Sequence, residues 1–151
     1  MFKRKVRVLF VCTGNSARSQ MAHAWARHLG GAWLEADSAG VAPKGIHPCT
    51  VTVMREVGVD LSAHVSKPLT PELIAWADLV VTVCAHADVQ CPVIPAGTQK
   101  RHWPVADPAM FAGDDARALP TFRAARDELR ERVEGILGGL RLLAATDQDR
   151  A

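Results

Sequence analysis

Apolar runs and polar breaks divide the chain into candidate strands separated by candidate helices. Residues 6–11 form a β-branched apolar run interrupted only by Arg7, as expected for a strand that is buried on both faces. Residues 79–84, LVVTVC, form the clearest strand pattern in the chain, and weaker patterns cover 33–39 and about 100–105. The sequence therefore predicts four strands.

Between these runs, apolar residues recur at the spacing of a helix. One helical pattern covers 19–29 and ends at a Gly-Gly pair, a second covers about 48–57, and a third lies in LTPELIAWAD, where Thr70 is the expected N-cap. The last helix is expected to begin near Leu119 or Pro120. Its apolar face comprises Phe122, Ala125, Leu129, Val133, Ile136, Leu137, Leu140 and Leu143.

Strands that alternate with helices imply βαβ crossovers, and these give a parallel sheet with a ligand crevice at the carboxyl ends of its strands. The 151 residues fit one domain, which we assign to residues 1–145. The polar end, residues 146–151, is expected to fray. The predicted fold class is therefore α/β, a single domain with one site.

Charge and hydropathy restrict the partners. The 18 Lys and Arg residues nearly balance the 16 Asp and Glu residues and are spread along the chain, so no nucleic-acid partner is expected. The N-terminal apolar run is too short for a signal peptide, and no segment reaches the roughly 18 apolar residues of a membrane span. We expect a soluble, cytoplasmic monomer. In that reducing compartment, cysteines are more often catalytic, redox-active or metal-bound than disulfide-bonded.

The first strand leads into a loop with the composition of an oxyanion site. Cys12 ends the strand, and the loop then feeds the N-terminus of a helix, where free N–H groups and the helix dipole favour an anion. Arg18 can hold two oxygens of that anion, and Ser19 can donate a hydrogen bond to the Cys12 thiolate. Gly14 and Asn15 tolerate the left-handed backbone that turns N–H groups inward. The expected oxyanion-binding residues are Thr13, Gly14, Asn15, Ser16, Ala17 and Arg18.

The stretch VLFVCTGNSARSQMA resembles the low-molecular-weight protein tyrosine phosphatases and, more closely, the arsenate reductases built on the same fold. The resemblance continues through SAG, VMREVGVDLSAHVSKPL, ADLVVTVC and HWPVADPA, over nearly the whole chain. It implies a four-stranded parallel sheet with helices on both faces, Cys12 as nucleophile and Arg18 as oxyanion clamp. It also implies that Asp107, in the Asp-Pro pair of ADPAM, is the general acid that protonates the leaving oxygen.

Two features favour arsenate reduction over phosphatase activity. Ala109 follows the Asp-Pro pair, where the phosphatases usually place an aromatic residue, and CAHADVQC supplies Cys84 and Cys91, which a phosphatase does not need. The resemblance to thioredoxin-coupled reductases implies an order for the thiols. Cys84 attacks Cys12 and releases arsenite, and Cys91 then attacks Cys84 to leave a disulfide that thioredoxin reduces. Arsenate is the expected substrate, with phosphate or sulfate as competing anions, and neither a bound cofactor nor a metal is expected.

Several alternatives stay open at this stage. The chain could be a low-molecular-weight phosphatase, or a protein that binds arsenite or another soft metal through Cys12, Cys84 and Cys91. Cys84 could instead be a core cysteine at a strand end and Cys91 a surface thiol without a role. The two could also join His86 and His102 in a metal site, although their spacing is not that of a zinc knuckle.

Some reductases of this type bind a monovalent cation beside the loop through acidic and polar side chains. At the matching places this chain has His23 and Lys67. Our hypothesis is that the Lys67 ammonium replaces the cation and holds the loop, with Asn15 and Ser38 as its oxygen partners. Cys49, in HPCTVT, is expected to have no catalytic role.

Overall fold

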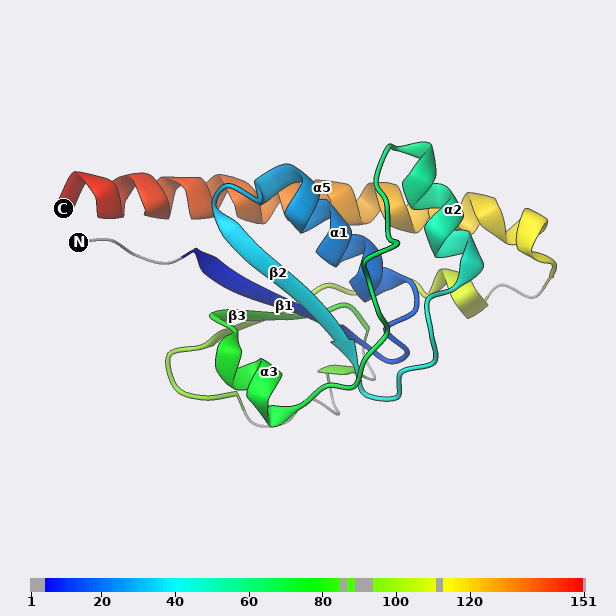
Figure 1. Cartoon of the computed structure of the whole chain (residues 1–151), viewed down its shortest axis with the longest axis horizontal. Coiled ribbons are helices and arrows are strands. Elements are labelled where there is room, and N and C mark those ends of the chain that lie inside the picture. The colour runs from blue at the N-terminus through cyan, green and yellow to red at the C-terminus, as the bar shows by residue number, and fades with distance from the viewer. Residues whose placement is uncertain (1–4, 85–86, 89–93, 111–112, 151) are drawn as a thin grey trace.

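The computed structural model describes residues 5–84, 87–88, 94–110 and 113–150, with side chains described as far as residue 139. Its centre is a four-stranded, fully parallel sheet with the strand order β2-β1-β3-β4 (Figure 1). The strands are β1 (Val6–Cys12), β2 (Leu34–Gly40), β3 (Leu79–Thr82) and β4 (Gln99–His102). The predicted fold class is confirmed.

The strand predictions are correct in position and differ at the ends. β1 is central and buried from Val8 to Cys12, as its continuous apolar run indicated. β3 ends at Thr82, two residues before the predicted end, because the partner strand β4 stops pairing there. β4 is exposed along its whole length, which explains its weak apolar signal.

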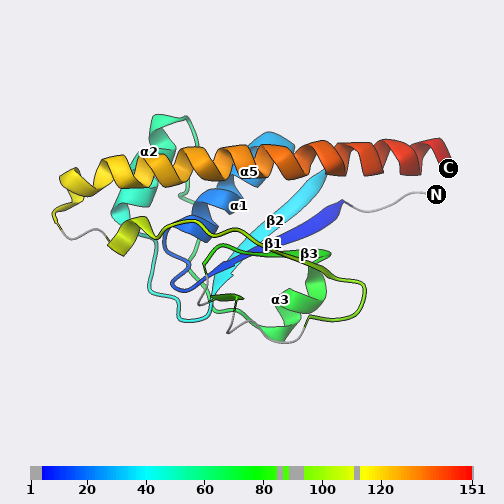
Figure 2. The same cartoon turned by 180° about the vertical axis from the view of Figure 1, so that it is seen from behind.

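Helices cover both faces of the sheet. α1 and α5 lie on one face and α3 lies on the other, while α2 packs against α5 (Figures 1 and 2). The Thr70 hydroxyl accepts a hydrogen bond from the Leu73 N–H at 3.2 Å, so the predicted N-cap of α3 is confirmed. The helices are α1 (Arg18–Gly30), α2 (Pro48–Glu56), α3 (Pro71–Trp76), the 3-10 turn η1 (Pro108–Met110) and α5 (Asp115–Arg150).

The predicted start of the last helix was wrong. α5 begins at Asp115, and the Asp114 carboxylate accepts the Arg117 N–H at 2.8 Å, as an N-cap residue does. Pro120 therefore lies inside the helix instead of at its start, and it costs the helix one backbone hydrogen bond. The backbone stays helical past Gly138 and Gly139 to Arg150. Fraying of residues 146–151 stays a prediction.

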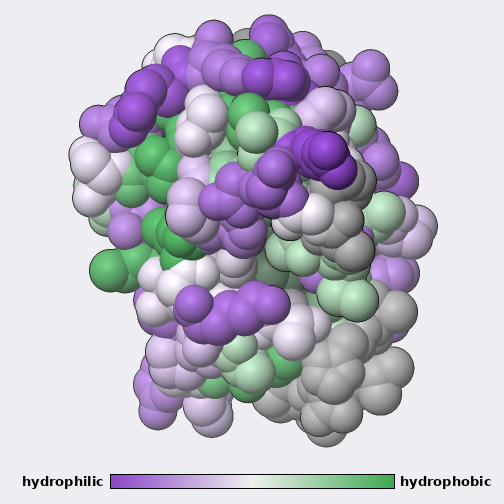
Figure 3. Space-filling view, turned by 90° about the vertical axis from the view of Figure 1, so that its right-hand side faces the viewer, coloured by the Kyte–Doolittle hydropathy of each residue, from purple (hydrophilic) through white to green (hydrophobic). Residues whose placement is uncertain are grey.

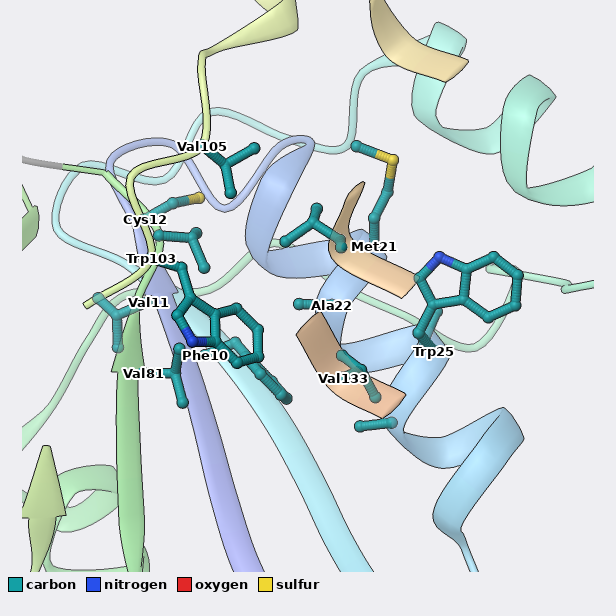
Figure 4. Close-up of a cluster of buried hydrophobic side chains, with 14 of the residues drawn as sticks. Phe10, Val11, Cys12, Met21, Ala22, Trp25, Val81, Trp103, Val105 and Val133 are labelled. Atoms are coloured by element: carbon teal, nitrogen blue, oxygen red, sulfur yellow. The ribbon is translucent and has the colours of Figure 1, made fainter. Parts of the chain in front are cut away.

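The core fills the space between β1, α1 and α5, and Cys12 lies at one end of it (Figure 4). Phe10 and Trp103 pack with ring centroids 5.9 Å apart, and Trp25 is buried with its indole N–H donated to the Arg126 carbonyl at 3.0 Å. Cys12, the nucleophile predicted from the sequence, is thus part of a closely packed core. Within the described residues, no helix combines the length and the apolar character that a membrane crossing requires.

Candidate active site

The loop that joins β1 to α1 is held from outside by the segment that follows β2. Backbone N–H groups of residues 41, 42, 44 and 47 donate to the carbonyls of residues 12, 13, 14 and 16, over 2.8 to 3.2 Å. A peptide unit is planar with its C=O and N–H pointing in opposite directions, so carbonyls turned outward leave the following N–H groups turned inward. Asn15, at φ 46°, supplies the left-handed turn that this arrangement needs. The loop is built to hold an anion at its centre.

Gly40 lets β2 approach the loop closely. A Cβ atom at this position would lie 2.7 Å from the Thr13 carbonyl oxygen and 2.8 Å from the Asn15 backbone nitrogen. Both distances are far below van der Waals contact, so only glycine fits here without moving the loop. The SAG segment is therefore part of the anion site, a role that its sequence alone did not show.

The Ser19 hydroxyl lies within hydrogen-bond distance of the Cys12 sulfur, and the contacts of Asn15 show which of the two atoms donates. Cys12 is buried, and its Sγ lies 2.8 Å from the Ser19 Oγ. The Asn15 Oδ1 accepts N–H groups from the Lys67 backbone and the Gln20 side chain, both at 3.0 Å, so the Asn15 amide nitrogen is the donor that faces Ser19, at 2.7 Å. The Ser19 proton is then directed at the Cys12 sulfur, which accepts this hydrogen bond.

Arg18 connects the loop to the segment that carries Asp107. Its guanidinium is almost fully buried, with Nη1 donating to the carbonyls of Val83 at 3.3 Å and Val105 at 2.9 Å. Its Nη2 lies 3.4 Å from the Asp107 Oδ2. The Asp107 Oδ1 accepts the Ala109 N–H at 2.9 Å, which fixes the carboxyl group at the rim. Charge-assisted contacts of this kind hold both groups in one orientation.

A single pocket brings together the predicted nucleophile, clamp and acid. Its lining residues are Cys12, Gly14, Ser16, Ala17, Arg18, Lys44, Asp107 and Ala109. Sequence reasoning missed Lys44. Its side chain lies directly over Gly14, because a Cβ atom added to that glycine would be 2.7 Å from the Lys44 Cε. Lys44 adds a positive charge to the mouth of the pocket, and Ala109 adds a small side chain, so the lining residues that the structure describes include no aromatic ring.

A second thiol lies against the loop. The Cys84 Sγ is 3.3 Å from the Thr13 Oγ1 and accepts the Ala87 N–H at 3.3 Å. Cys84 is 6% exposed, and Cys12, Cys49 and Cys84 are all free thiols. Thr13 is the neighbour of Cys12 in the chain, so two thiols lie on either side of one loop residue. Cys91 lies outside the described residues.

The predicted partners of Lys67 were wrong. Its ammonium pairs with the Asp37 carboxylate, while the Ser38 hydroxyl lies 3.0 Å from the His23 Nδ1. Asp37 and Ser38 are adjacent in β2 and therefore point to opposite faces, and the charged acceptor holds the cation. Lys67 contacts the Asn15 side chain through its backbone N–H and not through its ammonium. The loop is supported by the Lys67 main chain, and the replacement of a bound cation stays a hypothesis.

One buried and one half-buried histidine, His23 and His64, lie behind the loop. The rings of His23 and His64 stack with centroids 4.2 Å apart, and the His64 Nδ1 lies 3.0 Å from the Gln20 Oε1. Burial lowers the pKa of His23 to about 3, helped by the charges of His64, Arg27 and Lys67. Burial also lowers the pKa of His64. Both rings are therefore neutral at pH 7, and Gln20, a residue that sequence reasoning missed, connects them to Asn15.

The cysteine and histidine metal site considered for CAHADVQC has little support. The His102 Nδ1 lies 2.9 Å from the Thr82 Oγ1, while Cys84 faces Thr13 and Ala87. His86 lies outside the described residues, as Cys91 does. In the described part of the chain, a different set of side chains, His47, Cys49 and Asp115, lies close enough together to share an ion.

The fold and this pocket define a protein of the phosphatase-like class that holds a cysteine beneath an oxyanion loop. The chain belongs to the low molecular weight phosphotyrosine protein phosphatase family, whose model matches residues 7–148. It is 42% identical over 128 residues to an arsenate reductase of Halalkalibacterium halodurans, covering 84% of this chain and 91% of the relative.

Solved structures agree with this assignment. A structure described as an arsenate reductase in the phosphate binding state superposes with a TM-score of 0.73 at 33% identity, covering 89% of this chain and 98% of the other. A thioredoxin-dependent arsenate reductase of Corynebacterium glutamicum also gives a TM-score of 0.73, at 28% identity. That match covers 93% of this chain and 63% of the Corynebacterium chain.

Proposed function

We propose that this chain reduces arsenate to arsenite at Cys12 and that thioredoxin restores its thiols. Similarity to arsenate reductases over most of the chain supports the reaction, and the thioredoxin-dependent neighbour supports the electron donor. The observation that carries the proposal is the position of Cys84, whose Sγ lies 3.3 Å from the Thr13 Oγ1 of the oxyanion loop. A two-electron reduction needs a second thiol at this place, and phosphate ester hydrolysis does not.

In the first step, the Cys12 thiolate bonds to arsenic while one arsenic–oxygen bond breaks. The inward N–H groups of the loop and the Arg18 guanidinium hold the remaining oxygens, which carry the negative charge. Asp107 protonates the oxygen that leaves, because an unprotonated oxyanion is a poor leaving group. The Arg18 contact at 3.4 Å keeps the Asp107 carboxyl group beside the oxyanion pocket.

In the second step, the Cys84 thiolate attacks the Cys12 sulfur. The sulfur–arsenic bond breaks, and its electron pair stays on arsenic, which leaves as arsenite. Two thiols have then lost two electrons, and arsenic has gained them. The Ala87 N–H donates a hydrogen bond of 3.3 Å to the Cys84 sulfur, which orients the attacking atom.

In the third step, Cys91 attacks Cys84 and frees Cys12 for the next turnover, which leaves a Cys84–Cys91 disulfide. A thioredoxin dithiol then takes over this disulfide by two thiol exchanges. The proposed enzyme works in the cytoplasm as a monomer, with no bound cofactor, and phosphate and sulfate compete with arsenate for the loop.

Phosphatase activity is the second candidate. The family to which the chain belongs is named for phosphotyrosine protein phosphatases, and phosphate has the same tetrahedral shape as arsenate. Hydrolysis of a phosphate ester would need only Cys12, Arg18 and Asp107. Cys84 would have no role in it. The two candidates therefore differ in their need for the second thiol.

The test measures NADPH oxidation on addition of arsenate to the reduced protein, with thioredoxin and thioredoxin reductase present and phosphate absent. We expect oxidation that depends on arsenate in the parent and in Cys49→Ser, a matched control at a buried thiol outside the relay. Cys84→Ser should stop turnover. Hydrolysis of p-nitrophenyl phosphate that survives in Cys84→Ser, with no arsenate-dependent oxidation in the parent, would establish the phosphatase instead.

A further inference from the structure

Three side chains with different ligand atoms meet where α2 and α5 begin. The cluster consists of His47 and Cys49 at the start of α2 and Asp115 at the start of α5, and its ligand atoms all lie within 4.8 Å of one another. Figures 1 and 2 show α2 lying beside the first turns of α5. The cluster is outside the oxyanion pocket, because none of the three residues lines that pocket.

The donor set is that of a zinc-class cation. An imidazole nitrogen, a thiolate sulfur and a carboxylate oxygen are the ligands that Zn²⁺ prefers, in a tetrahedral arrangement. Metal–ligand bonds of about 2.0–2.3 Å place the ligand atoms of such a site about 3.3–3.7 Å apart. The cluster at up to 4.8 Å needs to close by about one ångström, which side-chain rotation at the exposed Asp115 can supply.

Two of the donors already lie next to one another. The His47 Nδ1 accepts the Cys49 N–H at 3.0 Å, so this nitrogen carries no proton, and a cation bound to it would take the place of this capping hydrogen bond. The Cys49 Sγ lies 3.5 Å from the main-chain carbonyl of Asp115, which places the thiol beside the residue that would supply the carboxylate. Cys49 is 2% exposed, whereas Asp115 faces solvent and leaves an entry path. Figure 3 views this end of the molecule, where hydrophilic residues interrupt the hydrophobic ones.

We propose that His47, Cys49 and Asp115 bind one divalent cation of the zinc class, Zn²⁺ or Cd²⁺, with water as the fourth ligand. Binding exchanges the thiol proton of Cys49 for the metal, and that proton is released to solvent.

The bound cation would join two segments that border the oxyanion site. The His47 N–H and the Thr50 hydroxyl both donate to the Ser16 carbonyl, at 3.0 and 2.9 Å, so the start of α2 supports the loop. Asp115 begins the helix that follows the Asp107 segment. A cation bound between α2 and α5 stabilises this arrangement, and we expect it to raise the midpoint of thermal unfolding.

The test uses Co²⁺ as the probe and the full chain with Cys12, Cys84 and Cys91 replaced by serine, so that Cys49 is the one remaining thiol. We expect one Co²⁺ per chain, with thiolate-to-metal absorption, intense tetrahedral visible bands and release of one proton, and Zn²⁺ should displace it. Asp115→Asn should weaken binding at least tenfold, while the matched control Asp114→Asn, which keeps the α5 cap, should not.

A second ligand variant separates binding from folding. His47→Asn retains a side chain that can cap α2 and removes the imidazole, so it should fold and lose at least tenfold in Co²⁺ affinity. Absence of thiolate-to-metal absorption in the parent background would overturn the proposal. Equal Co²⁺ affinity in the parent, Asp115→Asn and His47→Asn, with circular dichroism unchanged, would also overturn it.

Discussion

The buried His23 predicts that the protein loses stability when the pH falls from 7 to 5. The pKa of His23 is lowered to about 3 in the folded protein, because burial and the charges of His64, Arg27 and Lys67 disfavour the protonated ring. In the unfolded chain, the His23 side chain binds a proton as the pH falls through about 6.5. In the folded protein it remains neutral at that pH. The contribution of His23 is therefore complete above pH 6.5 and is lost as the pH falls toward 3.

The expected loss can be worked out from these two values. Integration between a folded pKa of about 3 and an unfolded value of 6.5 gives a decrease in unfolding free energy of about 2 kcal/mol from pH 7 to pH 5 for His23 alone. The lowered pKa of His64 adds to the decrease in the same direction. This window lies above the usual titration of carboxylates, at about pH 4, so these histidines dominate the change.

Urea unfolding of the reduced protein at pH 5, 6 and 7 tests this prediction. The variant His23→Gln is neutral and keeps a polar group near Ser38, so its unfolding free energy should fall by about 1.2 kcal/mol less than that of the parent between pH 6 and pH 5. His28→Gln, at an exposed position of the same helix, is the matched control and should behave as the parent does. Equal pH dependence in His23→Gln and the parent would refute the assignment of a neutral buried ring.

Three further predictions concern the oxyanion loop. Ser19→Ala removes the hydrogen bond of 2.8 Å to the Cys12 sulfur, and the loss of one such bond to a charged group, about 1.5 kcal/mol, should slow iodoacetamide alkylation of Cys12 at pH 7 about tenfold. Lys44→Ala removes a positive charge from the pocket mouth and should raise the KM for arsenate about two- to fivefold at low salt, as steady-state assays over a salt series will show. Gly40→Ala places a Cβ 2.7 Å from the Thr13 carbonyl and should lower the unfolding free energy by about 2 kcal/mol, whereas Gly135→Ala, whose Cβ meets nothing within 4 Å, should not destabilise the protein in the same urea titration.

The two thiols beside the loop connect these results to the proposed chemistry. The Cys12 sulfur lies 2.8 Å from the hydroxyl of Ser19 in the first turn of α1, and Asn15 of the loop donates to that hydroxyl. Cys84 follows β3 and contacts Thr13. The parallel arrangement of β1 and β3 brings both thiols to the same edge of the sheet. The proposed relay would therefore use the general property that parallel strands end together.

The sequence by itself determined the local part of the site. The spacing of Cys12 and Arg18 and the strand and helix on either side act over a few residues, and the structure has them where they were predicted. Of the two residues expected to take the left-handed backbone, Asn15 does so and Gly14 does not. Thr70 as a cap was predictable for the same reason, since a cap bonds within one turn. The start of α5 was missed because Asp114 and Pro120 are both helix-start signals, and only the capping hydrogen bond decides between them.

Tertiary structure alone decided the partners that are distant in sequence. Residues 41–47 hold the loop carbonyls, the Lys67 main chain orients the Asn15 amide, and Asp37 takes the Lys67 ammonium. Several acceptors near β2 were chemically suitable for that ammonium, and strand alternation determined which one it meets. The meeting of His47, Cys49 and Asp115 has the same origin, because the packing of α2 on α5 joins segments that no local pattern relates.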